Sequence, residues 1–218
     1  MRSVRSLLTQ GNDKVGEAIH LWSLPAGDDA SCPGSTSLCR KHCYARSGRY
    51  RFQAVKDRLA WNLEQARGAD FVGAMSREIR QRGCLVVRVH ASGDFFDADY
   101  ASKWLAVMTK CPAPRYYWYT RSWRVGSILP VLHTMAQLSN CVGWFSTDRE
   151  SGRPADVPPG VRVAHMLTDA SETPEADLVF RIRRLRRTRV PLQVVCPSER
   201  PDRVDRTINC GSCRHCWD

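Results

Sequence analysis

Segments that read as strands alternate along this chain with segments that read as helices, and no other feature constrains the fold as much. Short apolar runs rich in β-branched and aromatic residues predict strands at 18–24, 85–90, 116–120, 141–146, 161–166 and 192–195. Apolar residues at helical spacing predict helices at 55–66, 71–82, 100–109 and 128–138. This alternation is typical of βα units on a parallel sheet.

Six strands in 218 residues suit either a partial barrel or an open, doubly wound sheet. In both architectures ligands gather at the carboxyl ends of the strands. Polar residues that directly follow a predicted strand are therefore the candidates for a site. They are Cys32, Cys39, Cys43, Ser92, Gly93, Asp94, Thr120, Arg121, Ser146, Thr147 and Asp148.

The charge balance favours a polyanionic partner. Lys and Arg number 33 against 22 Asp and Glu, a net charge of +11, and such an excess favours nucleic acid first. No apolar run approaches the roughly 20 residues that cross a bilayer, and the first residues do not resemble a secretory signal. We therefore expect a cytoplasmic monomer with no membrane partner.

Seven of the ten cysteines fall into two groups, and in a reducing compartment grouped thiols more often bind metal than form disulfides. The first group, Cys32-x6-Cys39-x3-Cys43, follows the first predicted strand. Three thiolates can hold three irons of a [4Fe–4S] cluster and leave the fourth iron open. With His42 or His20 as a fourth ligand they would instead form a zinc site. Unrelated buried thiols rarely cluster in a loop with so many basic and turn residues.

The second group lies at the C-terminus and has four cysteines, Cys196, Cys210, Cys213 and Cys216. Its tight C-x2-C-x2-C run, with a remote cysteine followed by proline, is similar to bacterial ferredoxin ligation. A zinc knuckle with His215 as a spare ligand is the alternative. Four ligands leave no open position, so a structural or electron-transfer role is expected rather than a substrate site.

Four motifs follow one another along the chain: C-P-G…C-R-K-H-C-Y-A at 32–45, S-G-D-F-F at 92–96, Y-T-R-S-W-R at 119–124 and S-T-D-R at 146–149. In this order they closely resemble the phage gene product 88 domain family, over most of the chain. They are also similar to the phage gene product 37/68 family, which is related to radical S-adenosylmethionine (SAM) enzymes.

The resemblance implies a partial (β/α)6 barrel of radical-SAM type over residues 1–190, followed by a cysteine-rich metal module over 191–218. It implies that Tyr44 packs near the adenine of SAM. Ser92-Gly93-Asp94 stands where those enzymes have a Gly-Gly-Glu-type motif, so Asp94 would contact the SAM ammonium. The cysteine spacing differs, because those enzymes usually have C-x3-C-x2-C. By the same resemblance the cluster ligands would be Cys32, Cys39 and Cys43.

Two further residues follow or end predicted strands and are candidates for chemistry. His90 ends the predicted strand 85–90, just before Ser92-Gly93-Asp94. The candidate catalytic residues are His90 and Asp94. Asp148 is a candidate contact to substrate or to the SAM ribose. The alternatives are a hydrogen-bonded core histidine for His90 and a solvated loop for Asp148. We expect His165, within a predicted strand, to be structural.

Basic residues near the end of the chain suggest where nucleic acid would bind. Six arginines stand within residues 181–189, and arginine binds phosphate bidentately and stacks on bases. A solvated charged segment is the alternative. Residues beyond the predicted strand 116–120 are further candidates for contact with bases or phosphates. The predicted nucleic-acid contacts are Arg121, Trp123, Arg124, Arg183, Arg184, Arg186 and Arg187.

Together these features predict an iron–sulfur, radical-SAM-like enzyme that acts on nucleic acid. It would hold one or two [4Fe–4S] clusters, use SAM, and take electrons from a reductase or a flavodoxin-type donor. The alternative is a non-catalytic nucleic-acid-binding metalloprotein with structural iron–sulfur or zinc sites.

Overall fold

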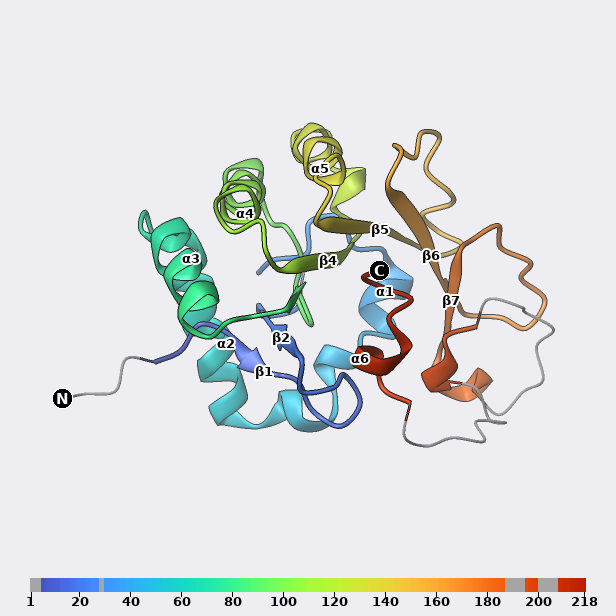
Figure 1. The fold of residues 1–218 in the computed structure, drawn as a ribbon. Helices are drawn as coiled ribbons and strands as arrows, with labels where there is room; N and C mark the ends of the chain where they lie inside the picture. Colours follow the sequence, from blue (N-terminus) through green and yellow to red (C-terminus); the bar gives the residue numbers. More distant parts are fainter. Residues whose placement is uncertain (1–4, 28–29, 187–194, 200–207) are drawn as a thin grey trace.

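The computed structural model describes residues 5–27, 30–186, 195–199 and 208–218. They form a seven-stranded sheet in the order β1 to β7 (Figure 1). The strands are β1 (Thr9–Gln10), β2 (Ile19–Leu21), β3 (Val86–Val89), β4 (Arg115–Thr120), β5 (Cys141–Thr147), β6 (Val161–Leu167) and β7 (Leu178–Arg181). The α-helices are α1 (Ser37–Lys41), α2 (Gln53–Arg67), α3 (Phe71–Gln81), α4 (Ala98–Lys110), α5 (Leu129–Ala136) and α6 (Cys210–Cys213). Short 3-10 turns are η1 (Tyr44–Arg46), η2 (Gly48–Arg51), η3 (Ser122–Arg124), η4 (Arg183–Leu185) and η5 (Pro197–Glu199).

The strand order confirms an α/β fold with a mostly parallel sheet. β1 pairs antiparallel with β2, and every later neighbouring pair is parallel. Spatial order equals chain order from β2 to β7, so the sheet has no point at which the strand order reverses, as it would in a doubly wound fold. Within the described ranges β1 and β7 lie at opposite ends of the sheet, and no pairing closes it into a barrel.

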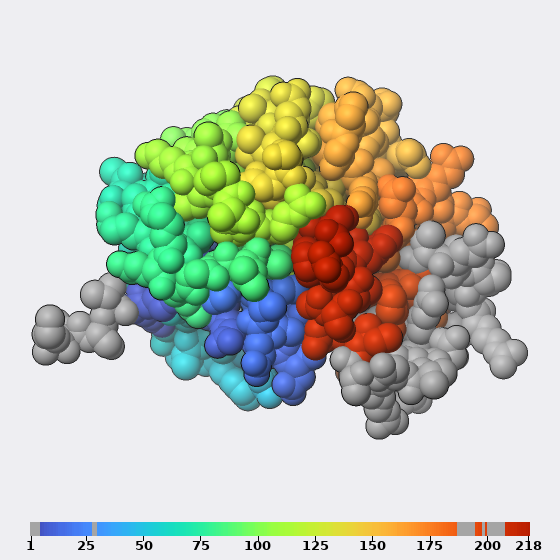
Figure 2. Space-filling view, in the orientation of Figure 1, coloured from blue at the N-terminus to red at the C-terminus, as the bar shows by residue number. Residues whose placement is uncertain are grey.

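The two faces of the sheet are covered by different parts of the chain. Helices α3, α4 and α5 lie outside the curve of the sheet, and the segment with α6 lies inside it (Figure 1). On the outer face Val87, Val89 and Trp118 join the main core. On the inner face Val86 and Tyr117, from the sheet, pack with Trp217, from the C-terminus. The C-terminal segment, red in Figure 2, fills the middle of the visible face.

The predicted elements agree with the structure in type, and the differences lie near both edges of the sheet. The strand predicted at 18–24 is shorter, and β1 and β7 were not predicted. Most of the strand predicted at 192–195 lies outside the described residues, although Val195 forms a parallel bridge with Val179 of β7. The predicted division at residue 190 also falls outside them. In the part of the chain that the structure describes, no helix is long and apolar enough to cross a bilayer.

His90 lies in an aromatic network at the end of β3. The Tyr100 hydroxyl accepts the indole N–H groups of Trp22 at 2.7 Å and Trp104 at 2.9 Å. Its own hydrogen is therefore directed to His90 Nε2, 2.8 Å away. The imidazole ring of His90 packs edge-on against the Phe95 ring, with 4.6 Å between the ring centroids. Burial first, and then the charge of a nearby arginine, lower the pKa of His90 to about 3. These contacts favour the structural interpretation of this histidine.

His90→Asn tests this interpretation, because asparagine tolerates the positive φ of 66° at this position and does not titrate. Between pH 6.5 and about pH 3 the unfolded chain binds a proton at His90 and the folded chain does not. His90 therefore makes unfolding easier as the pH falls, by about 3 kcal/mol between pH 7 and pH 4. Urea unfolding across this range should show a shallower loss of stability in the variant. Parallel profiles would contradict the assignment.

Candidate metal centres

The first cysteine group lies in the connection from β2 to α2, which contacts the carboxyl ends of later strands. Within it, Thr36 caps α1, because its hydroxyl accepts the Cys39 backbone N–H at 2.9 Å. Cys32, Cys39 and Cys43 are all half-buried. The Cys39 thiol lies within electrostatic range of the other two. The structure therefore brings the three predicted ligands into one region.

Asp148, directly after β5, is fully buried and fixes this loop to the sheet. Its Oδ2 accepts the Thr36 hydroxyl at 2.6 Å and pairs with the Arg121 guanidinium at 2.7 Å. Its Oδ1 accepts the backbone N–H groups of Glu150 at 2.9 Å and Ser151 at 3.0 Å. The carboxylate therefore accepts three hydrogen bonds and is charge-paired with Arg121. Asp148, predicted as a cofactor contact, holds α1 and Arg121 in place.

Two more contacts attach the loop to the ends of β4 and β5. Glu150 accepts a hydrogen bond from the Ser37 hydroxyl. Gly34 lies so close to β4 that a Cβ there would be 2.1 Å from the Arg121 carbonyl oxygen. The Gly34 carbonyl in turn accepts from Arg124 Nη1 at 2.8 Å. A residue with a side chain at position 34 would force the cysteine loop away from the sheet.

The Ser92-Gly93-Asp94 motif packs against the beginning of the same loop. The Ser92 hydroxyl donates to the Leu24 carbonyl at 2.8 Å. Gly93 has a φ of +76°, and a Cβ there would lie 2.6 Å from Ser31 Oγ. The conformation and the close approach both require glycine. The motif therefore supports the loop that carries Cys32, whatever further contacts it makes.

The buried Asp94 carboxylate is largely engaged within the protein. Its Oδ1 accepts the Thr120 hydroxyl at 2.5 Å and the Phe95 N–H at 2.8 Å, and its Oδ2 accepts the Arg121 N–H at 2.7 Å. Burial raises the pKa of Asp94 to about 6, against the opposing effect of these hydrogen bonds. The Ser122 hydroxyl also lies close enough to lower the pKa of this carboxyl.

Two thiols of the first group, those of Cys32 and Cys39, have raised pKa values. Burial, followed by the charge of Asp94, raises the pKa of Cys32 to about 12. Burial also raises the pKa of Cys39, although Arg121 opposes this effect. Thiols of this kind are poor nucleophiles at neutral pH. They become thiolates when they coordinate a metal ion, whose charge compensates theirs.

Tyr44 connects this loop to the end of β3. Its hydroxyl donates to the Ala91 carbonyl, whereas the residue as a whole is 58% exposed. Its ring meets Tyr50 edge-on at 6.0 Å. The ring is thus fixed at both ends beside Cys43, with a face open to solvent on which a flat heterocycle could stack.

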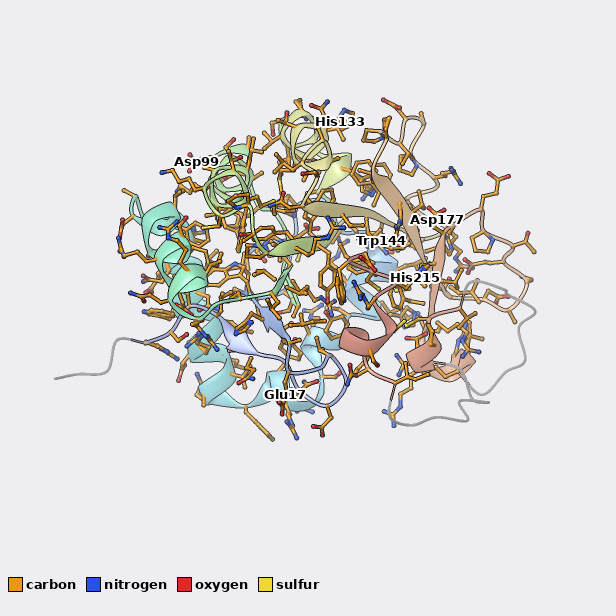
Figure 3. All side chains as sticks on the ribbon, viewed as in Figure 1. Glu17, Asp99, His133, Trp144, Asp177 and His215 are labelled. Atoms are coloured by element: carbon orange, nitrogen blue, oxygen red, sulfur yellow. The ribbon has the colours of Figure 1, made fainter. Side chains whose placement is uncertain are left out.

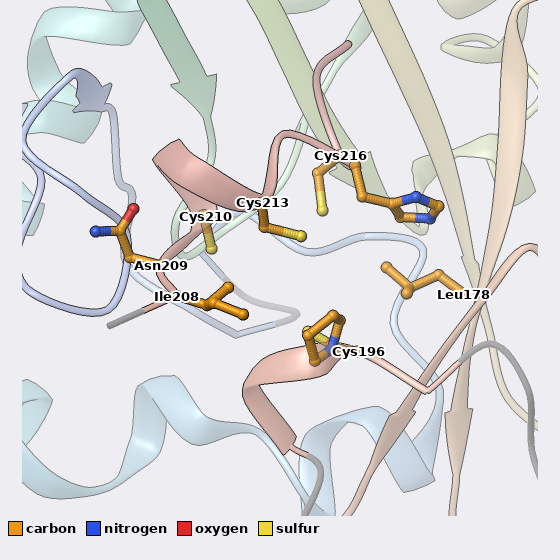
Figure 4. A pocket seen from close by; sticks show the side chains of 9 residues that line it. Leu178, Cys196, Ile208, Asn209, Cys210, Cys213 and Cys216 are labelled. Carbon is orange, nitrogen blue, oxygen red and sulfur yellow. The ribbon is translucent and has the colours of Figure 1, made fainter. Parts of the chain in front are cut away.

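The second cysteine group surrounds one cavity of about 30 Å³ (Figure 4). Cys196 reaches it from the segment after β7, and the other three cysteines come from α6 and the residues that follow it. The structure thus brings together four predicted ligands that are up to 20 residues apart in sequence. The remaining lining residues are Leu178, Pro197, Ile208, Asn209 and His215.

This second group is attached to the inner face of the sheet. The Tyr119 hydroxyl donates to Cys216 Sγ at 3.0 Å, and the Trp144 indole N–H donates to the Cys216 carbonyl at 2.9 Å. His215 lies beside Trp144, with 5.8 Å between ring centroids (Figure 3). In the described ranges no three His, Cys, Asp or Glu side chains adopt the geometry of a formed metal site. What the structure shows for this group is four thiols that line one cavity.

The three nucleic-acid candidates after β4 are engaged within the protein. Arg121 is buried and paired with an aspartate. The Trp123 indole N–H donates to the Ser146 carbonyl at 3.0 Å, and its ring stacks on Phe145. Arg124 donates to a backbone carbonyl of the cysteine loop. Arg121 is thus withdrawn from solvent, whereas Trp123 is half-buried and Arg124 is exposed and retains donors.

The arginine run is more accessible. Arg183, Arg184 and Arg186 are exposed, and Arg187 lies outside the described residues. Arg186 pairs with Glu199 at 2.8 Å, and Arg184 donates to a backbone carbonyl. Each guanidinium retains donors that face solvent, since arginine has five.

Sequence reasoning missed a second basic surface, directly after Cys43. Arg46, Arg49, Arg51 and Phe52 are exposed there, and none of the three arginines forms a salt bridge with any described residue. The signal was available, because no Asp or Glu occurs between residues 30 and 56, where six Lys and Arg occur. The capping role of Thr36 had no such signal, whereas Thr120 was a candidate from its position at a strand end.

The family model that describes gene product 88 matches residues 6–218. The chain belongs to the gene product 88 family. A gene 88 protein of Mycobacterium phage L5 is 32% identical over 170 residues, which cover 73% of this chain and 65% of that protein. A gene 88 protein of Mycobacterium phage D29 is 32% identical over 152 residues, 65% of this chain and 61% of that protein. No solved structure matches.

Membership of the gene product 88 family confirms one of the two family resemblances. The chain spans somewhat less than two thirds of the length of these two relatives. Their names state no activity, so the chemistry of the gene product 88 fold is inferred from its own residues.

Asp148→Asn should loosen the cysteine loop. The Arg121 and Asp148 side chains are only 8% and 0% exposed, and breaking a buried pair leaves one charge uncompensated, at a cost of about 3–5 kcal/mol. Asp70→Asn is the matched control, because the Arg77 and Asp70 side chains are 59% and 74% exposed and such pairs contribute less than about 1 kcal/mol. Urea unfolding and protease cleavage within residues 30–52 measure the two effects. Equal behaviour of the variants would contradict the anchoring role.

Proposed function

We propose that this protein is an iron–sulfur protein of radical-SAM-like type, in which Cys32, Cys39 and Cys43 hold a [4Fe–4S] cluster with one open iron. The observation that carries the proposal is the position of the cysteine loop. It is attached to the carboxyl ends of β3, β4 and β5, beside a carboxylate with a raised pKa. Ligand sites in α/β proteins lie at this edge of the sheet.

The residues of the loop suit such a cluster. Cys39 lies within electrostatic range of both Cys32 and Cys43, so the loop provides three thiol ligands. With His42 or His20 as a fourth ligand the same loop would hold zinc instead. When bound, an open iron of this kind would supply reductive cleavage of SAM, with electrons from a reductase or flavodoxin-type donor. The order of the parallel strands is compatible with a partial (β/α)6 barrel, although β5, β6 and β7 follow one another with no helix between them in the described part of the chain.

The protein's own residues would bind and orient the reactants. The Asp94 carboxylate, which ends the Ser92-Gly93-Asp94 motif, would contact the ammonium group of SAM. The exposed face of Tyr44 suits its adenine. Ser92 and Gly93 would hold the backbone that positions Asp94, since the Ser92 hydroxyl donates to the Leu24 carbonyl. His90, at the start of the same turn, is held by its hydrogen bond with the Tyr100 hydroxyl.

The C-terminal group, Cys196, Cys210, Cys213 and Cys216, would hold a second, fully ligated metal site. Four thiols around one cavity provide a complete ligand set for either a [4Fe–4S] cluster or zinc. A site of this kind would fasten the C-terminal segment to the inner face of the sheet. The proposed cofactors are therefore one or two [4Fe–4S] clusters, SAM and, in the second site, zinc as the alternative.

Metal and acid-labile sulfide content of anaerobically purified protein tests the proposal. Two clusters predict about eight irons and eight sulfides per chain. Replacing Cys32, Cys39 and Cys43 by serine should remove about half of both, and so should Cys210→Ser with Cys213→Ser. Cys84→Ser is the control, because this buried cysteine belongs to neither group. Zinc without sulfide in both groups would overturn the iron–sulfur proposal.

Nucleic acid is the proposed substrate or partner class. The net charge of +11 and two exposed basic surfaces support it, one around η4 and one over η1 and η2. The second surface adjoins Cys43 and adds exposed aromatic rings, which stack on unpaired bases. If neither cysteine group supports SAM chemistry, these surfaces favour the second candidate, a nucleic-acid-binding metalloprotein without catalysis.

Binding of a single-stranded oligonucleotide should weaken steeply with salt, because each neutralised phosphate releases a counterion. Changing Arg46, Arg49 and Arg51 to Gln should lower the slope of log affinity against log salt by about one for each phosphate that is no longer neutralised. Changing Arg183, Arg184 and Arg186 to Gln measures the contribution of the basic surface around η4 to the same slope. Arg77→Gln with Arg153→Gln is the control, at exposed positions elsewhere. Salt-independent binding, or equal weakening in the control, would contradict a nucleic-acid partner.

A further inference from the structure

Arg88 is a cation on the inner face of the sheet with no acidic partner among the described residues. Its neighbours Val87 and Val89 face the main core on the other side, so alternation along β3 directs Arg88 inward, like Val86. There its guanidinium lies over the rings of Tyr117 and Tyr119, at 5.9 Å and 5.7 Å from their centroids.

Buried hydrogen-bonding atoms of Arg88 and Tyr117 lack partners among the described residues. Arg88 forms no ion pair with any described residue, and its buried Nε has no hydrogen-bond partner there. The buried Tyr117 hydroxyl also has none within the same ranges. The two residues are direct neighbours in the β3–β4 register, where Arg88 pairs with Tyr117. Buried donors, and buried charges above all, are normally matched by an acceptor.

The cluster lies between the two cysteine groups. Tyr44, from the first cysteine loop, and Cys210, from the C-terminal group, are both within electrostatic reach of Arg88. The same reach extends to Cys216. A molecule bound on this part of the inner face would therefore contact residues close to both proposed metal sites.

We propose that Arg88 and Tyr117 form an oxyanion-binding position, which takes a carboxylate or phosphate group of a bound small molecule. The guanidinium presents parallel N–H donors to such a group, and the tyrosine hydroxyl adds a third. The aromatic rings stabilise the cation but accept no conventional hydrogen bond, so they leave these donors unmatched. This position goes beyond the proposed iron–sulfur chemistry and does not depend on which metal the cysteines hold.

The arginine Nε–H signals of the full chain test the proposal by nuclear magnetic resonance, with Arg88 assigned through the disappearance of its signal in Arg88→Lys. Inorganic phosphate and acetate are titrated separately at constant ionic strength. The Arg88 signal should shift saturably with at least one of them, while the signal of exposed Arg77 stays in place. The anion that binds more tightly identifies the source as a phosphate ester or a carboxylate. Tyr117→Phe should weaken this binding about fivefold, as expected for removal of one hydrogen bond.

An Arg88 signal that neither anion moves would overturn the proposal. A signal that moves only when metal is loaded would also overturn it, because Arg88 would then be the counter-charge of the C-terminal metal site. The metal content of Arg88→Gln is measured as well, so that a failure of anion binding at Arg88 can be told apart from a failure of metal binding by the cysteines. We expect it to equal that of the unaltered chain.

Discussion

The buried carboxylate of Asp148 is the contact on which the candidate site depends. It joins the end of β5 to α1 through Thr36 and to the end of β4 through Arg121. Its burial would be costly without these partners, since an isolated buried charge is strongly destabilising. Because it accepts three hydrogen bonds and pairs with Arg121, the carboxylate connects the cysteine loop to two strand ends at once. Asp94 likewise connects the end of β3 to the end of β4, because it accepts hydrogen bonds from the Thr120 hydroxyl and the Arg121 backbone N–H.

The inner face of the sheet imposes the second constraint. In a closed barrel this face would be filled by side chains from opposite strands, but here the described sheet is open and the C-terminal segment covers it. Trp217 packs against β3 and β4, and Cys216 is held by Tyr119 and Trp144. A metal ion bound by the four cysteines would therefore attach the C-terminal segment to the inner face of the sheet. The first group, at the strand ends, lies where a ligand would enter.

The class of fold could be predicted from the sequence because its main signals are local. Strands with long apolar runs, such as 85–90 and 116–120, and helices with clear periodicity were predicted within a few residues. β7 was missed because its four residues merge into a charged run, and β1 has only two. The two cysteine groups could be recognised from their spacing, and the structure brings the members of each group together. The burial of Arg121 could not be predicted from the sequence, because it depends on the ion pair with Asp148, which is distant along the chain. Pairing between distant residues of this kind cannot be inferred from a strand-end position alone.

Electron paramagnetic resonance of the reduced, iron-loaded chain, with and without SAM, tests the central claim most directly. If the first cysteine loop holds a cluster with an open iron, SAM should change one of two cluster signals. That change should disappear in Cys39→Ser and persist in Cys213→Ser. Full iron loading with signals that SAM leaves unchanged would contradict a SAM-binding site at the strand ends. The cysteine loop would then have a structural role only.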